Sequence, residues 1–303
     1  MNLIYIILIV ILVVLTIPVL FGLLLPVFKP RLSQNGSIYL YAFSSGFFFI
    51  LGVFGFLSEA KEDLIGWFEL NNTPIVNQWL ISISILGLVS AFVLTSSLFI
   101  KYLLVKKIGN KDAKDHGVHE GHDQHQVHNH DQLIYNPNDV DPKAKLFSIL
   151  LILAHKIPGG LILGFLIFSI SEKQDIDLLQ IMFLVTFILH MIPEALIIFY
   201  RQIEVGIDKW KATLNSFLAT MILIPFIFIG AYSSSAIHSN ANFEIIFAIA
   251  KVCVGSFFIY TALIEFIPEF LHQNINAKTW YFSMIFLIIG IVSCLSIFSV
   301  HAH

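Results

Sequence analysis

Long apolar runs dominate the chain, and polar residues gather in the stretches between them. A membrane-spanning helix needs about 20 consecutive apolar residues. Eight segments meet this requirement, at roughly 2–27, 37–57, 79–104, 146–170, 178–200, 212–236, 243–270 and 279–300. The stretches 32–58, 70–100, 212–237 and 279–300 contain no Asp, Glu, Lys or Arg at all. The pattern predicts an all-α polytopic membrane protein with eight transmembrane helices.

Composition favours lipid over water as the surroundings. Apolar residues make up 57% of the chain, charged residues only 12%, and the mean hydropathy is +0.84, whereas a soluble domain is about a quarter charged. The net charge of −3 gives no indication of nucleic-acid binding. Cys253 and Cys294 fall in apolar runs, so we expect packing roles and no disulfide framework. Residues 1–28 carry no charge and therefore lack the basic start of a cleavable signal, so we expect them to form the first span.

The distribution of Lys and Arg predicts the orientation of the helices. With the N-terminus outside, the predicted inner loops hold 13 of the 17 basic residues, and the outer loops hold only Lys61 and Lys173. Basic residues concentrate on the cytoplasmic side of membrane proteins. We therefore expect a multi-pass protein of the cell (cytoplasmic) membrane with both termini outside.

A polar segment, residues 106–144, separates residues 1–105, with the first three helices, from residues 145–303, with the last five. Its centre is rich in histidine, at His116, His119, His122, His125, His128 and His130. Glycines and the lack of apolar periodicity predict a disordered cytoplasmic loop. Imidazole binds Zn, Cu and Ni, so we expect this loop to contact metal weakly. The alternatives are a solvated linker of biased composition or a pH-sensitive tether.

Two predicted helices share a motif in their interiors. Residues 155–162 read His-Lys-Ile-Pro-Gly-Gly-Leu-Ile, and residues 190–197 read His-Met-Ile-Pro-Glu-Ala-Leu-Ile. Consecutive helices run antiparallel across a membrane. The two copies therefore suggest a pseudo-two-fold inverted repeat, an arrangement that places transporter binding sites near the bilayer midplane.

The shared motif brings metal-binding groups into the membrane interior. A histidine there is costly without a polar partner or a water cavity, Glu194 lies one turn after His190, and each Pro leaves a carbonyl without its helical donor. Imidazole nitrogen combined with carboxylate oxygen suits Zn²⁺, Fe²⁺, Mn²⁺ or Co²⁺. We predict a metal site formed by His155, His190 and Glu194. The alternative is that each His makes an ordinary hydrogen bond between helices.

Further acidic groups lie near both predicted membrane surfaces, where they would concentrate cations. These are Glu59, Glu62 and Asp63 at the outer side, and Glu265 and Glu269, joined by His272, at the inner side. The alternative is ordinary interfacial charge. Lys251 is expected to extend outward along its aliphatic stem and receives no role.

In their order and topology these features resemble the ZIP (Zrt/Irt-like) divalent metal-ion permease family, as a divergent bacterial-type member. The resemblance rests on the paired His-x-x-Pro motifs, the His-rich loop between the third and fourth helices, and the segments Gly-Phe-Leu-Ser-Glu-Ala at 55–60 and Ile-Glu-Phe-Ile-Pro-Glu-Phe at 264–270. It implies eight helices, both termini outside, and two metals side by side at the midplane. The primary site of the family would map to His155, His190 and Glu194.

The chain departs from the family pattern at several ligand positions. A further carboxylate of the primary site falls at Gly159, and the secondary-site positions hold Lys156, Met191 and Ile224. We expect the Lys156 ammonium to pair with Glu194 and to take the place of the second metal. At most one metal ion should therefore bind.

The sequence thus predicts ZIP-like transport of a divalent transition-metal ion into the cytoplasm. Zn²⁺ is the first candidate, with Fe²⁺, Mn²⁺, Co²⁺ and Cd²⁺ as alternatives. We expect the metal as substrate, no organic cofactor, no enzymatic activity, a lipid bilayer as surroundings, no nucleic-acid partner, and a homodimer as an assembly to test. A non-transporting metal sensor or regulator on the same fold is the alternative. An intramembrane zinc hydrolase is disfavoured, because no water-activating Glu stands next to either motif His.

Overall fold

The computed structural model describes residues 3–28, 32–71, 74–115, 149–150, 152–173, 178–237, 243–271 and 276–299. These residues are nearly all helical and contain no strand. Eight helical spans within them are long and apolar enough to cross a membrane. The prediction of an all-α, multi-pass membrane protein with eight spans is confirmed; the inverted repeat stays a prediction.

The helices pack into two sets. The first set is α1 (Leu3–Phe28), α6 (Lys156–Lys173), α7 (Leu178–Glu204), α8 (Lys209–Met221) and α9 (Leu223–Ile237). The second set is α2 (Gln34–Ile50), the π-helix η1 (Leu51–Leu57), α3 (Ser58–Leu70), α4 (Ile75–Asp115), α10 (Phe243–Tyr260), the π-helix η2 (Thr261–Phe266), α11 (Ile267–Leu271) and α12 (Ala277–Ser299). The sets meet mainly where α6 packs on α10 and α2 packs on α7.

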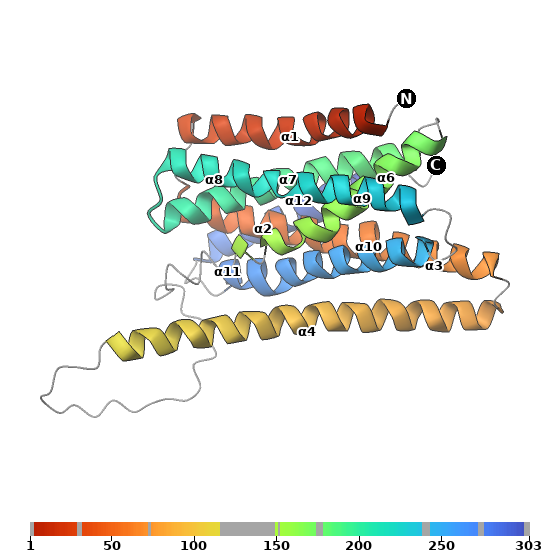
Figure 1. The fold of residues 1–303 in the computed structure, drawn as a ribbon. Helices are drawn as coiled ribbons and strands as arrows, with labels where there is room; N and C mark the ends of the chain where they lie inside the picture. The colour runs from red at the N-terminus through yellow and green to blue at the C-terminus, as the bar shows by residue number, and fades with distance from the viewer. Residues whose placement is uncertain are drawn as a thin grey trace, which may run out of the picture.

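Figure 1 shows the spans running side by side, with α1 at one edge of the bundle and α4 at the opposite edge. Both ends of the chain lie at the same end of the bundle, on the right of the figure, as an even number of spans requires. We call this the terminal end, and the opposite end, where α7 connects to α8, the far end. The predicted outer side corresponds to the terminal end.

Prolines determine where two of the spans break. Neither Pro158 nor Pro225 has an amide hydrogen to donate to the carbonyl four residues before it. Residues 152–154 are helical, His155 forms a turn, and α6 begins directly after it. In the same way α8 and α9 separate at Ile222, three residues before Pro225. The predicted fourth span is thus interrupted at His155, as expected from the missing donor of Pro158.

Two spans are longer than the apolar pattern predicts. The second runs from Gln34 to Leu70 through the π-helix η1 and so carries the acidic segment after residue 58 on the same rod. The helix α4 has 41 residues and is therefore roughly 60 Å long, more than the thickness of a bilayer. Residues 106–115, predicted as the start of the loop, belong to this helix. The histidines at 116–130 lie outside the described residues.

Glycines let the helices approach closely, as is typical of helix pairs in membranes. A Cβ placed on Gly164 of α6 would lie 2.3 Å from the Ile227 carbonyl oxygen and 2.6 Å from the Ala231 nitrogen, both backbone atoms of α9. A Cβ on Gly290 of α12 would likewise lie 2.1 Å from the carbonyl oxygen of Phe43 on α2. Each set of helices thus contains a crossing at which only glycine fits.

We predict that Gly164→Ala lowers the stability of the protein, because the obstructing atoms are backbone and cannot rotate away. Overpacking of this kind costs about 1–3 kcal/mol. The matched control is Gly87→Ala on α4, where an added Cβ meets nothing within 4 Å. Thermal unfolding in detergent should show a lower melting temperature for Gly164→Ala alone. Equal melting temperatures of the two variants would contradict the close packing of α6 against α9 at Gly164.

The orientation of the bundle is tested by labelling single cysteines in a chain whose Cys253 and Cys294 are replaced. We expect a cysteine at Glu62, near the terminal end, to react with an impermeant maleimide added outside intact cells. A cysteine at the exposed Lys211, near the far end, should react only after the membrane is opened. The reverse pattern would overturn the predicted topology.

Candidate metal site

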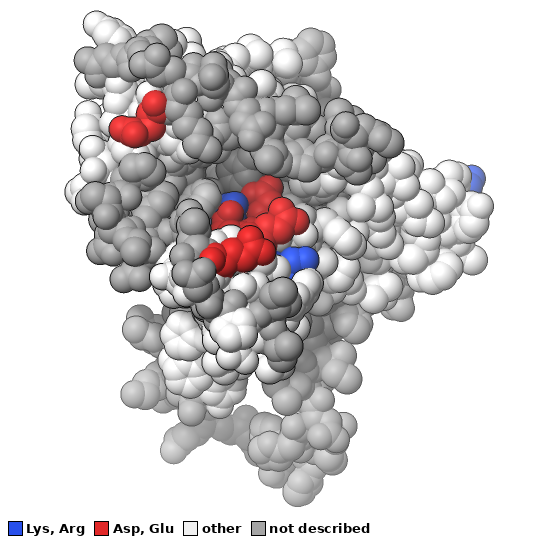
Figure 2. All heavy atoms as spheres, turned by 90° about the vertical axis from the view of Figure 1, so that its right-hand side faces the viewer, with Lys and Arg blue, Asp and Glu red and all other residues white. Residues whose placement is uncertain are grey.

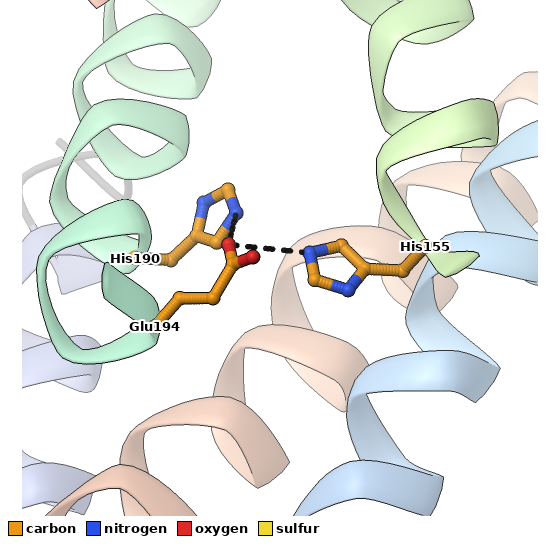
Figure 3. Close-up of side chains that lie close together, drawn as sticks. All are labelled: His155, His190 and Glu194. Carbon is orange, nitrogen blue, oxygen red and sulfur yellow. Dashed lines mark ion pairs between the residues drawn. The ribbon is translucent and has the colours of Figure 1, made fainter. Parts of the chain in front are cut away.

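The three residues predicted to bind metal lie together at the contact of α6 and α7 (Figure 3). His155 precedes α6, while His190 and Glu194 lie one turn apart on α7. The Glu194 Oε2 atom lies 3.5 Å from His155 Nε2 and 3.9 Å from His190 Nε2. One ligand atom from each residue lies within 4.8 Å of the others, and all three side chains are buried. The geometry brings two imidazoles and one carboxylate into reach of a single ion.

Phenylalanine rings enclose the two imidazoles. The Phe258 ring of α10 lies 4.9 Å from the ring of His155 and 5.0 Å from that of His190, measured between centroids. The Phe187 ring lies edge-on to His190 at 4.8 Å, and Phe48 of α2 lies at 6.3 Å. The site is therefore closed by residues of both helix sets, and its polar atoms are shielded from water.

Several polar atoms of this cluster have no hydrogen-bond partner. By hydrogen-bond geometry these are Nδ1 and Nε2 of His155, Nδ1 of His190 and both oxygens of Glu194. The Glu194 oxygens nevertheless lie in ion pairs, 2.8 Å from Lys156 Nζ and 3.5 Å from His155 Nε2. A buried polar atom without a partner is destabilising by about 1–3 kcal/mol. Native proteins therefore rarely retain a group of them without a functional reason. Coordination of a cation would satisfy these nitrogen and oxygen atoms together.

A lysine already occupies part of this space. The Lys156 ammonium lies 2.8 Å from Glu194 Oε1, and its side chain is 3% exposed. The ion pair expected from the sequence is thus present. Met191 is buried in an apolar cluster with Leu223 and Ile227, and Gly159 faces the Phe187 ring. Two of the secondary-site positions thus hold an ammonium and a thioether, and the primary-site position at Gly159 has no side chain.

The acidic segment predicted for the outer mouth lies at the terminal end, where acidic side chains gather (Figure 2). Glu59 and Asp63 both pair with Lys251, whose Nζ lies 3.1 Å from Glu59 Oε2 and 2.8 Å from Asp63 Oδ2. Glu62 is exposed. Lys251 is only 6% exposed, so the expectation that it extends outward is wrong. Two carboxylates on α3 hold it inside the protein.

The acidic pair predicted for the inner mouth lies at the far end and is already neutralised. Arg201 of α7 lies 3.3 Å from Glu269 Oε1 and 3.8 Å from Glu265 Oε2, and it donates to the hydroxyl of Tyr41. Lys101 of α4 donates to Glu265 at 2.7 Å. Arginine and lysine thus take the positions in which a metal ion was predicted. The third residue of that prediction, His272, lies outside the described residues.

Sequence reasoning missed Arg201, Lys251 and the Phe258 ring. Arg201 was assigned to an inner loop because it follows the apolar run, yet its side chain is 2% exposed. The pairing of Lys251 could have been predicted from charge. Glu59 and Asp63 lie one helical turn apart, and two neighbouring carboxylates are stabilised by a nearby cation. Nothing in the local sequence marks Phe258, because its ring contacts, with Phe48, His155 and His190, lie on other parts of the chain.

Comparison with known proteins adds one result. A family model described as ZIP Zinc transporter matches residues 1–297 of the chain. No curated protein matches the sequence. The matched segment includes seven spans, all but the last residue of the eighth, and the three residues of the candidate metal site.

We predict that Arg201→Met destabilises the protein strongly, because it removes the buried cation beside Glu269 and leaves Glu265 with Lys101 alone among the cations that pair with it. Breaking a buried ion pair by removing one partner costs about 3–5 kcal/mol. Adding Glu269→Gln to the Arg201→Met variant should recover part of the loss. Lys211→Met, which removes an exposed charge, is the control and should leave the melting temperature nearly unchanged. Equal melting temperatures of Arg201→Met and the control would show that the ion pairs of Arg201 with Glu265 and Glu269 do not stabilise the fold.

Proposed function

The chain belongs to the ZIP zinc transporter family, and from this premise we propose that it carries Zn²⁺ into the cytoplasm through His155, His190 and Glu194. The family itself implies transport of a divalent metal ion across a membrane. The choice of ion, the direction and the site are our proposal. The observation that carries it is the meeting of two buried imidazoles and one buried carboxylate within reach of a single ion.

The chemistry of the ligands supports zinc. Two imidazole nitrogens and one carboxylate oxygen are a frequent protein ligand set for this ion, and a water molecule can complete a tetrahedral shell. The same ligands also accept Fe²⁺, Mn²⁺, Co²⁺ or Cd²⁺, so competition between ions has to be measured. The metal is the substrate and passes through the site.

Lys156 sets the conditions for binding. Its ammonium lies 2.8 Å from Glu194, so a metal ion has to displace it from that carboxylate. Met191 lies in apolar packing and offers no oxygen or nitrogen. We therefore propose a single bound ion of modest affinity. Affinity should fall as the pH falls, because protons compete with the metal for the two histidines.

Alternating access follows from the position of the site between the two helix sets. His155, His190 and Glu194 belong to the first set, whereas Phe48 and Phe258, which cover them, belong to the second. A displacement of one set along the other would uncover the ion toward one end at a time. An interior-negative potential favours entry of two charges by about 4.6 kcal/mol per 100 mV. The His-rich loop would then receive the ion.

A non-transporting metal sensor is the second candidate. It is favoured by the Lys156–Glu194 pair and by Gly159, because both weaken the ligation expected of a transporter. Such a protein would bind metal at the same residues without moving it. Assembly as a homodimer stays a prediction under either function.

The proposal is tested by metal binding to a purified chain that lacks residues 115–131, so that the His-rich loop does not contribute. We expect one Zn²⁺ per chain at neutral pH and weaker binding near pH 5. Lys156→Asn should tighten binding about tenfold or more, because the competing ammonium is gone and a gain of about 1.4 kcal/mol suffices. His190→Ala should abolish binding.

The control for this series is Lys209→Met, which removes a lysine at the far end, away from the three ligands. It should bind like the parent chain. Two ions per chain at the midplane, or unchanged binding in His190→Ala, would reject the site.

A further inference from the structure

Lys251 occupies an unusual position at the terminal end of the bundle. It lies within the apolar sequence of α10, yet its ammonium is held between two carboxylates of α3, at 3.1 Å from Glu59 and 2.8 Å from Asp63. The same ammonium lies 4.5 Å from the centroid of the Phe247 ring. Its residue is 6% exposed, while the two carboxylate side chains are 29% and 27% exposed. The lysine is therefore enclosed, and its partners can be reached from the surface.

These carboxylates lie on the side from which an ion would approach the metal site. Glu59 lines a small cavity together with Thr186 and Phe187 of α7, and with residues of η1. The Phe187 ring, which lines this cavity, also contacts the ring of His190. Glu59 thus lies at the acidic end of the bundle seen in Figure 2 and is joined to His190 through the cavity and the Phe187 ring.

The charge of this mouth depends on Lys251. Without the lysine, two carboxylates one turn apart, of which Glu59 lines the cavity, would attract a divalent ion strongly. Passage requires that an ion be attracted at the mouth but also leave it, so tight binding there would slow transport. Lys251 removes one unit of negative charge and occupies the space between the two carboxylates.

We propose that Lys251 is a specificity-determining residue of the entrance, a fixed counter-ion that keeps Glu59 and Asp63 from chelating the transported metal. The role rests on the proposed function, because it assumes that metal enters from the terminal end. A purely structural role for the same lysine would hold α10 to α3 but would not change the metal concentration at which uptake is half-maximal.

The first test uses the full-length chain with His190→Ala, so that the midplane site is disabled. Equilibrium Zn²⁺ binding is compared with and without Lys251→Met; the His-rich loop is present in both, so its contribution cancels. We expect one additional Zn²⁺ per chain when Lys251 is removed, and its loss when Glu59→Gln and Asp63→Asn are added. No additional ion would overturn the proposal, and this result does not depend on whether the wild-type chain transports.

The second test is Zn²⁺ uptake into proteoliposomes by otherwise wild-type protein. Lys251→Met should lower the half-maximal Zn²⁺ concentration by about three- to tenfold and also lower the maximal rate. Lys251→Arg keeps the charge and should retain wild-type values. Lys61→Met is the control for charge. Lys61 lies on α3, like Glu59 and Asp63, but its ammonium lies over the Trp79 ring. A change in maximal rate with an unchanged half-maximal concentration would show a structural role only.

Glu59→Gln keeps the test decisive if Lys251→Met does not fold. In this variant the lysine stays and one carboxylate is lost, so the mouth becomes less attractive to cations. We expect the half-maximal Zn²⁺ concentration to rise by about threefold or more. A fall or no change would overturn the proposal.

Discussion

The low dielectric of a membrane interior requires that a buried charge have a counter-ion, and this constraint organises the polar part of the protein. Among the described residues, the buried Asp, Glu, Lys and Arg side chains are Lys156, Glu194, Arg201, Lys251 and Glu265, and each is ion-paired. The pairs form three clusters, one at the terminal end, one around the metal site, and one at the far end. Each cluster places a fixed cation beside carboxylates that could otherwise attract a metal ion.

The ion-pair clusters at the two ends of the bundle relate differently to the two helix sets. Lys251 and its partners on α3 belong to one set, so a displacement between sets leaves that cluster whole. Arg201 belongs to the first set, while Glu265 and Glu269 belong to the second. Under the proposed transport, opening the far end would break ion pairs, whereas admitting an ion at the terminal end would not. This asymmetry is consistent with a state closed toward the far end.

The sequence was sufficient for the features that depend on local pattern. The lengths of the apolar runs predicted the eight spans. The repeated motif predicted that His155, His190 and Glu194 lie together, and in the structure their ligand atoms are within reach of one ion. The resemblance to the ZIP family is confirmed. The helical residues 106–115 were missed, because a polar, lysine-rich segment carries no apolar periodicity. The enclosure of the imidazoles by Phe258 and the capture of Lys251 by α3 depend on packing between helices far apart in sequence, which local pattern does not encode.

The central claim is that an ion crosses the membrane by way of His155, His190 and Glu194. The most direct measurement is uptake of radioactive zinc into proteoliposomes, with wild-type protein and with Glu194→Gln, at matched amounts of folded protein. The account predicts saturable uptake by the wild-type chain, inhibited by competing divalent ions and abolished by Glu194→Gln. Zinc binding without uptake by the wild-type chain would contradict transport and favour the sensor, and unchanged uptake by Glu194→Gln would contradict the site.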